Sequence, residues 1–406
     1  MVENIPKMDE IEGIARFCRS FPFVYIYGYE LPQKRIAKYL SLSQLKINGY
    51  LVSYEAPGTA VCDEPLQVVD AFSLGMSQQE RREQVGVILS IEDCRYTNAV
   101  NLLQRAGYRN FFFMSEWNKR TIPYKMSPKS KDELEIEISL VDHCNLNCQC
   151  CDHFSPIAPP YYLELESFKK DIDRLAELTE HDIGRITLLG GEPLLHRQLL
   201  DFIRVTREAF SKALIVLFTN GILLSQWGKK GLWEAVKKYG IQVWVTVYPI
   251  QVDFEPTKQA LMCYKIPCFV GAAPQSNQSA CVWFLSEVGD RNYQGPKYSV
   301  KQPLDIYGAQ EAYRFIGCYQ FNDCITLRHG QLYTCPVIPY SRFFSERFHR
   351  NLPVCPEDSI DIYEARNFDE LAEYMTHRPP FCRHCIKQCS TMLEWKQSGQ
   401  SEFEWM

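Results

Sequence analysis

Short apolar runs alternate with amphipathic segments through residues 133–275, and this alternation predicts strands that are each followed by a helix. In "SFKKDIDRLAEL", apolar residues recur at helical spacing and place Phe168, Ile172 and Leu175 on one face. The runs "LEIEISLV", "RITLLGG", "ALIVLFTNG", "IQVWVTVYP" and "IPCFVGA" predict successive strands. Short connections favour a parallel sheet, either doubly wound or curled into a partial (β/α) barrel. We therefore expect an α/β core with its site at the carboxyl ends of the strands.

A shorter alternation precedes this core and predicts a small Rossmann-like α/β domain at residues 1–125. The turn after its first strand, "YGYELPQKR", lies where a dinucleotide site has the pattern G-x-G-x-x-G. Only Gly28 matches that pattern, since Glu30 and Gln33 stand at the other two glycine positions. The sequence therefore favours docking or substrate recognition over nucleotide binding. The polar, basic segment 115–133 contains two prolines and predicts a linker.

The chain has 406 residues, which is longer than a single typical core, so two or three domains are expected. Residues 133–300 form the core region, and residues 301–406 form a third, cysteine-rich region. The net charge of -5 argues against a nucleic-acid partner held by bulk electrostatics. No signal peptide opens the chain, and its longest apolar runs are too short to span a bilayer. We expect a cytoplasmic protein without a membrane partner.

The 17 cysteines, an odd number without an export signal, indicate metal or redox chemistry rather than a disulfide framework. Cys144, Cys148 and Cys151 have the spacing C-x3-C-x2-C directly after a predicted strand. One short loop of this kind can wrap three thiolates around a compact iron-sulfur core and leave one iron open. Zinc is the alternative, with Cys150 or His153 as the fourth ligand of a closed site.

A second motif, "RITLLGGEPLLH", ends the next predicted strand and places Gly190, Gly191, Glu192 and Pro193 at the same rim. Two glycines let the backbone close on a ligand, and a carboxylate with free carbonyls can receive an ammonium group. A simple turn from strand to helix would use the same glycines. This turn, however, follows the cysteine loop after one βα unit, which favours a shared ligand.

The motifs "CNLNCQCC" and "GGEP" resemble those of the radical SAM superfamily, over roughly residues 133–275. The resemblance implies that Cys144, Cys148 and Cys151 bind a 4Fe-4S cluster, whose open iron is chelated by S-adenosyl-L-methionine (SAM). It implies SAM contacts at the strand ends by Gly190, Gly191, Glu192, Pro193, Asn220 in "TNG" and Thr246. Glu192 would contact the SAM ammonium group. Cys150 stands where the family often has an aromatic residue over the adenine, so Phe154 or His153 is expected to stack there instead.

The cysteine-rich region resembles the twitch or SPASM extensions of radical SAM enzymes, although "CRHCIKQC" is shorter than a full SPASM run. This resemblance implies one auxiliary 4Fe-4S cluster. Its expected ligands are Cys318, Cys335, Cys382 and Cys385, with Cys324 and Cys389 as alternates. The stretch "ITLRHGQLYTCP" predicts a hairpin with its turn at Gly330. A zinc ribbon is the alternative, because C-x2-C after a hairpin is typical of one.

The resemblance implies reductive cleavage of SAM to a radical that abstracts hydrogen, with electrons from a donor such as flavodoxin or ferredoxin. The longer phrases "CDHFSPIAP" and "GGEPLLH" are similar to those of a subgroup found in bacterial carbohydrate and surface-polysaccharide contexts. We therefore expect a small polar substrate, such as a sugar or nucleotide-sugar, and an oxidation, deamination, epimerisation or rearrangement. Segment 273–299 has little periodicity and predicts either a lid or an irregular surface insertion. An epimerase needs a hydrogen donor, and Cys281 in this segment is the catalytic candidate, with a buried structural thiol as the alternative.

Two other functions stay open at this point. One is a peptide-maturation enzyme whose N-terminal domain recognises a leader peptide; such domains are usually winged helices, which the predicted α/β pattern does not match. The other is a non-catalytic iron-sulfur or zinc protein that binds or regulates, and the intact cysteine and "GGEP" motifs count against it.

Overall fold

The computed structural model describes residues 8–52, 67–71, 83–92, 95–271, 280–285, 298–301, 303–310, 315–316, 318, 320–386 and 391–406. The chain forms two compact units. The first comprises Met1–Ser127, Gln310–Tyr319 and Thr376–Arg378, and the second comprises Pro128–Ala309, Gln320–Met375 and Pro379–Met406. The second unit contains the expected core and most of the cysteine-rich region, so their separation into two domains stays a prediction.

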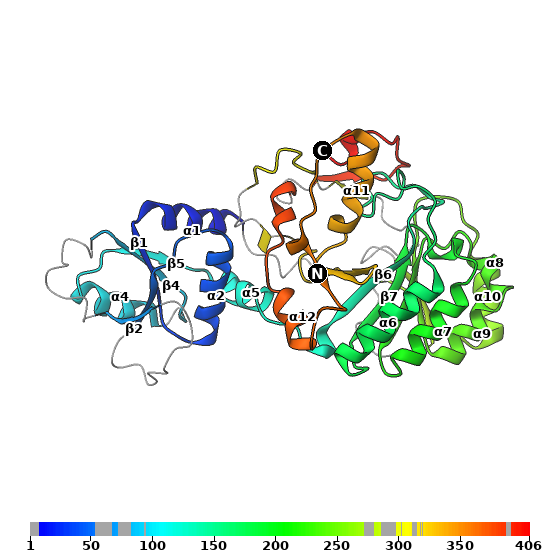
Figure 1. The fold of residues 1–406 in the computed structure, drawn as a ribbon, viewed down its shortest axis with the longest axis horizontal. Helices are drawn as coiled ribbons and strands as arrows, with labels where there is room; N and C mark the ends of the chain where they lie inside the picture. The colour runs from blue at the N-terminus through cyan, green and yellow to red at the C-terminus, as the bar shows by residue number, and fades with distance from the viewer. Residues whose placement is uncertain are drawn as a thin grey trace. The chain divides into compact units, whose positions relative to one another are not determined.

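The first unit is built on a five-stranded parallel sheet. In spatial order its strands are β3 (Gln67–Asp70), β2 (Gly49–Val52), β1 (Phe23–Tyr27), β4 (Val85–Leu89) and β5 (Asn110–Phe113). Its helices are α1 (Met8–Ser20), α2 (Leu31–Leu42), α4 (Tyr96–Arg105) and α5 (Glu116–Lys125) (Figure 1). The strand order 3-2-1-4-5 is that of a Rossmann sheet, which confirms the expected fold of this part.

The expectation of a linker at 115–133 is wrong, because α5 occupies half of that segment. The Ser115 side chain accepts a hydrogen bond from the Asn118 N–H and so caps the helix. Ile122 is fully buried, and its burial stabilises a helix whose last turns include Pro123. Helix α1 and strand β3 were also not expected from the sequence.

The second unit is built on a nine-stranded sheet. Its spatial order is β10 (Cys268–Val270), β11 (Cys281–Leu285), β9 (Gln242–Thr246), β8 (Leu214–Thr219), β7 (Arg185–Gly190), β6 (Glu135–Val141), β13 (Ile325–Arg328), β14 (Gln331–Tyr333) and β15 (Ile360–Asp361). The strands are parallel from β10 to β13, and β14 and β15 pair antiparallel. The sheet stays open at β10 and β15, which confirms an α/β fold of partial-barrel type.

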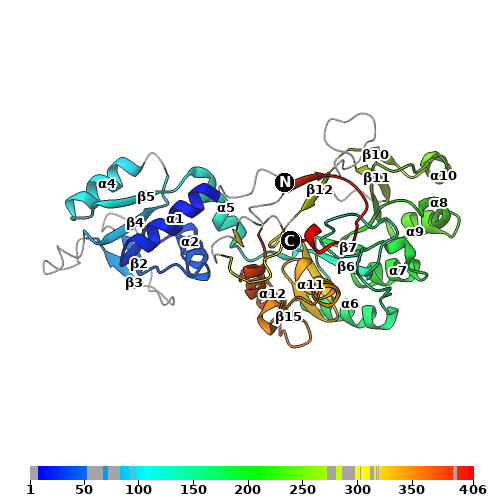
Figure 2. The same cartoon turned by 90° about the horizontal axis from the view of Figure 1, so that it is seen from above.

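Helices cover one face of this sheet (Figure 1, Figure 2). They are α6 (Leu165–Thr179), α7 (Leu199–Ala209), α8 (Leu224–Gly228), α9 (Leu232–Tyr239) and α10 (Glu255–Tyr264). Ile136 and Ile138 of β6 belong to the apolar core that these helices share with the sheet. Side chains alternate across a strand, so Glu137 between them faces the opposite, inner side of the curved sheet. The inner side is therefore where polar groups of this sheet are available.

Further elements of the second unit are β12 (Tyr298–Lys301), α11 (Val337–Phe348), α12 (Phe368–Tyr374) and β16 (Thr391–Glu394). Short 3-10 helices lie at Lys131–Glu133, Pro193–Leu195, Pro356–Asp358, Pro380–His384 and Glu402–Glu404. The predicted hairpin is confirmed: β13 and β14 pair antiparallel, and His329 (φ 50°) and Gly330 (φ 74°) form its two-residue turn. β16 pairs antiparallel with β12.

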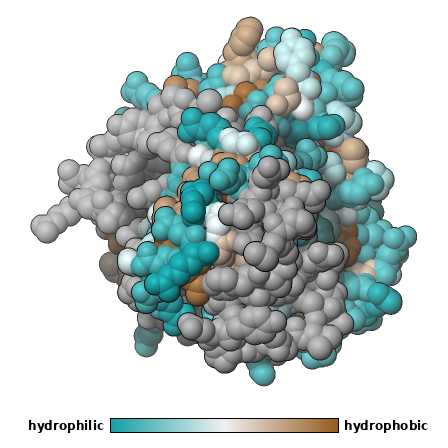
Figure 3. All heavy atoms as spheres, turned by 90° about the vertical axis from the view of Figure 1, so that its left-hand side faces the viewer, coloured by the Kyte–Doolittle hydropathy of each residue, from teal (hydrophilic) through white to brown (hydrophobic). Residues whose placement is uncertain are grey.

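No helix among the residues placed by the structure is both long and apolar enough to cross a bilayer. On the face drawn in Figure 3, hydrophilic side chains predominate among the coloured residues.

Candidate active site

The candidate site lies at one edge of the second unit's sheet. Strands β6, β7, β8 and β9 are parallel neighbours, so their carboxyl ends meet at the same edge. The cysteine loop follows β6, the Gly-Gly turn ends β7, and Asn220 follows β8. Thr246 is the last residue of β9. The structure therefore brings the predicted strand-end residues to a common rim.

Cys144, Cys148 and Cys151 are free, partly buried thiols in this loop. Burial raises the pKa of the Cys148 thiol to about 12, and the neighbouring Cys151 and Cys144 contribute to that rise. Burial likewise raises the pKa of Cys144 to about 11. Within the described ranges, no three His, Cys, Asp or Glu side chains are grouped so that they could hold one metal ion. The three thiols therefore lie close enough to influence one another's pKa, but they are not arranged around a position for one metal ion.

The cysteine loop contains three non-glycine residues in the left-handed region: Asn147 (φ 54°), Cys150 (φ 57°) and Phe154 (φ 52°). Such residues are uncommon and need surrounding contacts to hold them. Cys150 is buried, and this burial raises the pKa of its thiol to about 11. This placement supports the expectation that Cys150 is not a ligand.

The two glycines of "GGEP" fit the end of β7 directly against the start of the cysteine loop. The Gly191 N–H donates to the Val141 carbonyl over 2.7 Å, and the Glu192 N–H donates to the His143 carbonyl over 3.2 Å. A Cβ on Gly190 would lie 2.3 Å from the Val141 oxygen, and one on Gly191 would lie 2.1 Å from the His143 oxygen. Only glycine allows this approach, so the motif seats the cysteine loop on the sheet.

Glu192 is buried at the turn after β7, and its expected contact with the SAM ammonium group stays a prediction. Its carboxylate accepts hydrogen bonds from the Thr219 hydroxyl (2.7 Å), the Asn220 N–H (2.9 Å) and the Leu194 N–H (2.9 Å). Burial raises its pKa to about 7. Glu192 therefore ties the turn after β7 to the end of β8, and Pro193 begins a buried 3-10 turn behind it.

Asn220 joins the end of β8 to the cysteine loop. Its side-chain amide nitrogen lies 2.8 Å from Asn145 Oδ1 and 3.6 Å from the Cys144 sulfur. Its amide oxygen accepts from the Ile222 N–H over 3.1 Å. The amide orientation is therefore fixed, and its donor side faces a candidate cluster ligand.

The residues expected to stack on adenine are placed differently. Phe154 is 1% exposed and packs among apolar residues, with its ring centroid 5.5 Å from that of Trp405. His153 packs 4.9 Å from the Tyr340 ring, and burial lowers its pKa to about 4. Phe154 therefore has no free face for adenine, whereas His153 is half-buried and its stacking on adenine stays a prediction.

Cys281, the catalytic candidate from the sequence, lies away from the rim. It begins strand β11 and pairs in register with Gln242, the first residue of β9. These two parallel strands run toward the rim, so Cys281 lies at their opposite end. Residues 281–285 of the expected lid are thus a sheet strand, and 272–279 and 286–297 lie outside the described residues.

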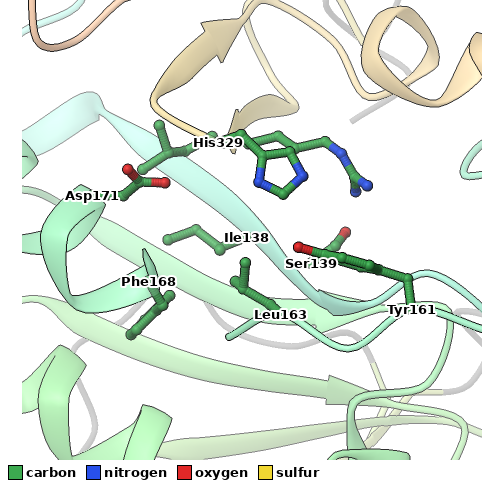
Figure 4. Close-up of a pocket in the computed structure, with 9 residues that line it drawn as sticks. Ile138, Ser139, Tyr161, Leu163, Phe168, Asp171 and His329 are labelled. Atoms are coloured by element: carbon green, nitrogen blue, oxygen red, sulfur yellow. The ribbon is translucent and has the colours of Figure 1, made fainter. Parts of the chain in front are cut away.

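A buried ion pair that sequence reasoning missed supports the base of the cysteine loop. Arg328 in β13 donates from both terminal nitrogens to Asp142, over 2.7 and 2.8 Å. Asp142 lies two residues before Cys144, and the Arg328 guanidinium stacks 4.7 Å from the Tyr340 ring centroid. A cavity beside Arg328, bounded by Ser139, Tyr161 and other residues drawn in Figure 4, measures about 10 Å³. It has room for about one water, not a substrate.

The second set of cysteines lies partly together. Cys335 is buried in an apolar cluster, and Cys385 packs against that cluster. Burial raises the pKa of Tyr374, and Cys335 and Cys382 both contribute to that rise, so these two thiols lie near the same phenol. Cys324 adjoins Cys335, as the hairpin predicts. Cys318 belongs to the first unit, and Cys389 lies outside the described residues.

Comparison with known proteins finds a family match within the core region. Residues 138–261 match a family described as "Radical SAM superfamily". GTP 3',8-cyclase of Peptoclostridium acidaminophilum is 27% identical over 108 residues, which are 27% of this chain and 33% of that protein. GTP 3',8-cyclase of Staphylococcus carnosus is 32% identical over 101 residues, 24% and 29% of the two chains. The matched part spans about a third of the length of these relatives.

Two of the solved structures that align with this chain are BtrN and SuiB. BtrN, in complex with AdoMet and 2-DOIA, is 16% identical, with 62% of this chain and 92% of BtrN covered and a TM-score of 0.35. SuiB of Streptococcus suis, bound to S-adenosylmethionine, is 12% identical, with 69% and 76% covered and a TM-score of 0.30.

Proposed function

We propose that this chain, which contains a radical SAM domain, is an enzyme that uses a 4Fe-4S cluster and SAM to abstract hydrogen from a small polar substrate. One observation carries the proposal. Three free thiols that influence one another's pKa lie at the same rim as the Gly-Gly turn, whose backbone N–H groups hydrogen-bond to the start of the cysteine loop. When bound at this rim, the cluster and SAM supply an electron and a hydrogen-abstracting radical.

The residues present fit such a cluster. Cys144, Cys148 and Cys151 would hold it, and each of their thiols has a pKa raised by burial, so that loading must release protons. Asn220 directs an amide N–H toward Cys144. The indole nitrogen of Trp395 is buried near Cys148 without a hydrogen-bond partner, a donor that a ligating thiolate could use. Gly190, Gly191 and Glu192 would hold the methionine end of SAM.

We also propose that the inner face of the sheet receives the substrate. Glu137 points to this face, and burial raises its pKa to about 7, with the nearby Asp152 contributing to the rise. Asp152 directly follows a candidate cluster ligand and hydrogen-bonds to the Gln320 amide. Carboxyl and amide groups near the candidate cluster suit a hydroxyl-rich or amino-bearing molecule, such as a sugar or nucleotide-sugar. Oxidation, deamination, epimerisation and rearrangement are all compatible with this lining.

An auxiliary 4Fe-4S cluster is part of the same proposal, with Cys335, Cys382 and Cys385 of the second unit as its ligands; the fourth expected ligand, Cys318, stays a prediction from the sequence. The shared neighbourhood of Cys335, Cys382 and Tyr374 supports it. A peptide-maturation role gains no support, because the first unit is a parallel α/β sheet rather than a winged helix.

The test is formation of 5'-deoxyadenosine by the anaerobically reconstituted protein with SAM and dithionite, beside the C144A/C148A/C151A variant. We expect product from the wild type and none from the variant. If the substrate is required for turnover, SAM will still change the electron paramagnetic resonance (EPR) spectrum of the reduced cluster. A wild type that shows neither product nor a SAM-dependent spectrum would refute the proposal and favour a binding or regulatory protein.

A further inference from the structure

The cysteine loop is held by a segment about 250 residues further along the chain, residues 394–405, here called the strap. The two segments run antiparallel at a bridge between Cys148 and Gln397. On one side of that bridge the Gln149 N–H donates to the Lys396 carbonyl over 3.0 Å, and on the other the Ser398 N–H donates to the Asn147 carbonyl over 2.7 Å. The strap thus pairs with the loop as a neighbouring strand would.

Side chains extend this pairing along the whole loop. The Gln149 side chain donates to the Glu394 carbonyl over 2.5 Å, and the Gln397 side chain donates to the Leu146 carbonyl over 3.2 Å. At the far end, the Trp405 indole N–H donates to the Cys151 carbonyl over 3.0 Å. Cys148 therefore pairs with the strap, and the Cys151 carbonyl accepts a hydrogen bond from it, whereas Cys144 lies outside this pairing.

Two strap side chains, those of Trp395 and Glu404, have a buried polar atom without a hydrogen-bond partner, and of these only Trp395 offers a donor. Its indole nitrogen is buried and has no hydrogen-bond partner, which is costly for a donor in a protein interior. Its ring lies 5.7 Å from the ring of Tyr248, which follows β9 at the rim. Gln397 pairs with Cys148 in the antiparallel bridge, and side chains two residues apart on an extended segment share a face, so the Trp395 side chain leaves the strap on the same face as the Cys148 thiol. The orphaned N–H therefore lies next to a candidate cluster ligand.

We propose that Trp395 is a positioning residue for the cluster, and that its indole N–H donates a hydrogen bond to the Cys148 sulfur when the cluster is bound. This inference rests on the proposed function. A cluster becomes more negative when it is reduced, and a donor to a thiolate stabilises the more negative state more strongly. The bond should therefore make the cluster easier to reduce and raise its midpoint potential.

The test measures the midpoint potential of the cluster whose EPR signal changes when SAM is added, so that an auxiliary cluster does not contribute. Trp395→Phe keeps the ring against Tyr248 and removes only the donor. Trp283→Phe is the matched control, because its indole nitrogen is also buried without a partner but lies in β11. We expect W395F to lower the reduced-to-oxidised ratio at a fixed potential by about fivefold to tenfold, a shift of up to about 59 mV toward negative potentials. W283F should match the wild type.

Each outcome decides the inference. An unchanged potential in W395F overturns it and leaves the proposed function intact, since the cluster and its response to SAM are still present. A wild type without a SAM-responsive cluster overturns both. If W395F fails to retain the cluster, Trp395→His restores a ring N–H at this position; recovery of iron and of the SAM-dependent signal in W395H supports the inference, and no recovery overturns it.

Discussion

Replacement of Arg328 by methionine is the change that most directly tests how the cysteine loop is supported. Arg328 and Asp142 are 7% and 2% exposed, and two hydrogen bonds of 2.7 and 2.8 Å join them. Methionine fills a similar volume but leaves the Asp142 carboxylate without its partner inside the protein. Because Asp142 lies two residues before Cys144, the disturbance reaches the candidate cluster loop directly.

The expected cost follows from this burial. Removal of one partner of a buried ion pair destabilises a protein by about 3–5 kcal/mol, since the remaining charge is uncompensated. Arg342 is the matched control: it lies 3.7 Å from the same carboxylate, but its side chain is 47% exposed. An exposed pair contributes about 0–1 kcal/mol, so R342M should have little effect. The difference between the two variants should therefore be about 2–5 kcal/mol.

The assay is urea unfolding of the metal-free protein, with the free energy of unfolding compared at equal m-values. A double variant, D142L/R328M, removes both charges and should recover most of the loss, because an apolar pair of similar volume is often as stable as a buried ion pair. The reasoning is refuted if R328M loses less than about 1 kcal/mol, or if R328M and R342M lose the same amount.

Three further predictions address the turn after β7 and the second set of cysteines. The folded pKa of Glu192, about 7, exceeds its ordinary 4.5, so the wild type should lose up to about 3 kcal/mol of stability as pH rises from 4.5 to 7. E192Q cannot ionise, so its free energy of unfolding in urea should differ less between pH 5 and pH 8 than that of the wild type. An equal difference in both proteins would contradict the raised pKa of Glu192. G191A should displace the His143 carbonyl and reduce iron incorporation. G240A is the control: a Cβ at Gly240 has no neighbour within 4 Å, so this variant should lose about 1 kcal/mol of stability and keep its iron. Equal iron content in the two variants would contradict the role of Gly191 in holding the cysteine loop on the sheet. C382A should lower the iron content per chain by up to that of one cluster, as measured by iron analysis. C355A is the control and should keep its iron. An unchanged iron content in C382A would exclude Cys382 as a ligand.

The sequence predicted the elements whose signal is local. Strands β6 to β9 are continuous apolar runs separated by amphipathic helices, and each was expected where the structure has it. Strand β11 was not expected, because polar, irregular sequence surrounds its five residues. Helix α5 was hidden by two prolines and a basic composition, although Ser115 followed by Glu116 is an N-terminal signal that could have revealed it.

The same limit applies to the candidate site. The cysteine loop and the Gly-Gly turn are compact motifs, and their placement at one rim follows from strand order. Arg328 lies 186 residues from Asp142, and no periodic pattern relates them. The burial of Glu192 also could not be foreseen, because the three donors that surround its carboxylate come from its own turn and from the next strand. Pairing between distant segments is a property of the folded chain, and single-sequence patterns do not encode it.

The pairing of the strap with the cysteine loop also sets an order of events during synthesis. Leu146 and Gln397 are 251 residues apart, so at translation rates of about 5–20 residues per second the loop leaves the ribosome roughly 10–50 s before its partner. Throughout that interval, Cys148 and Cys151 lack the strand that will cover them and are open to the cellular machinery that delivers iron and sulfide. Pairing with the strap can then close the loop over whatever it has received, so the timing of translation favours metal delivery before closure.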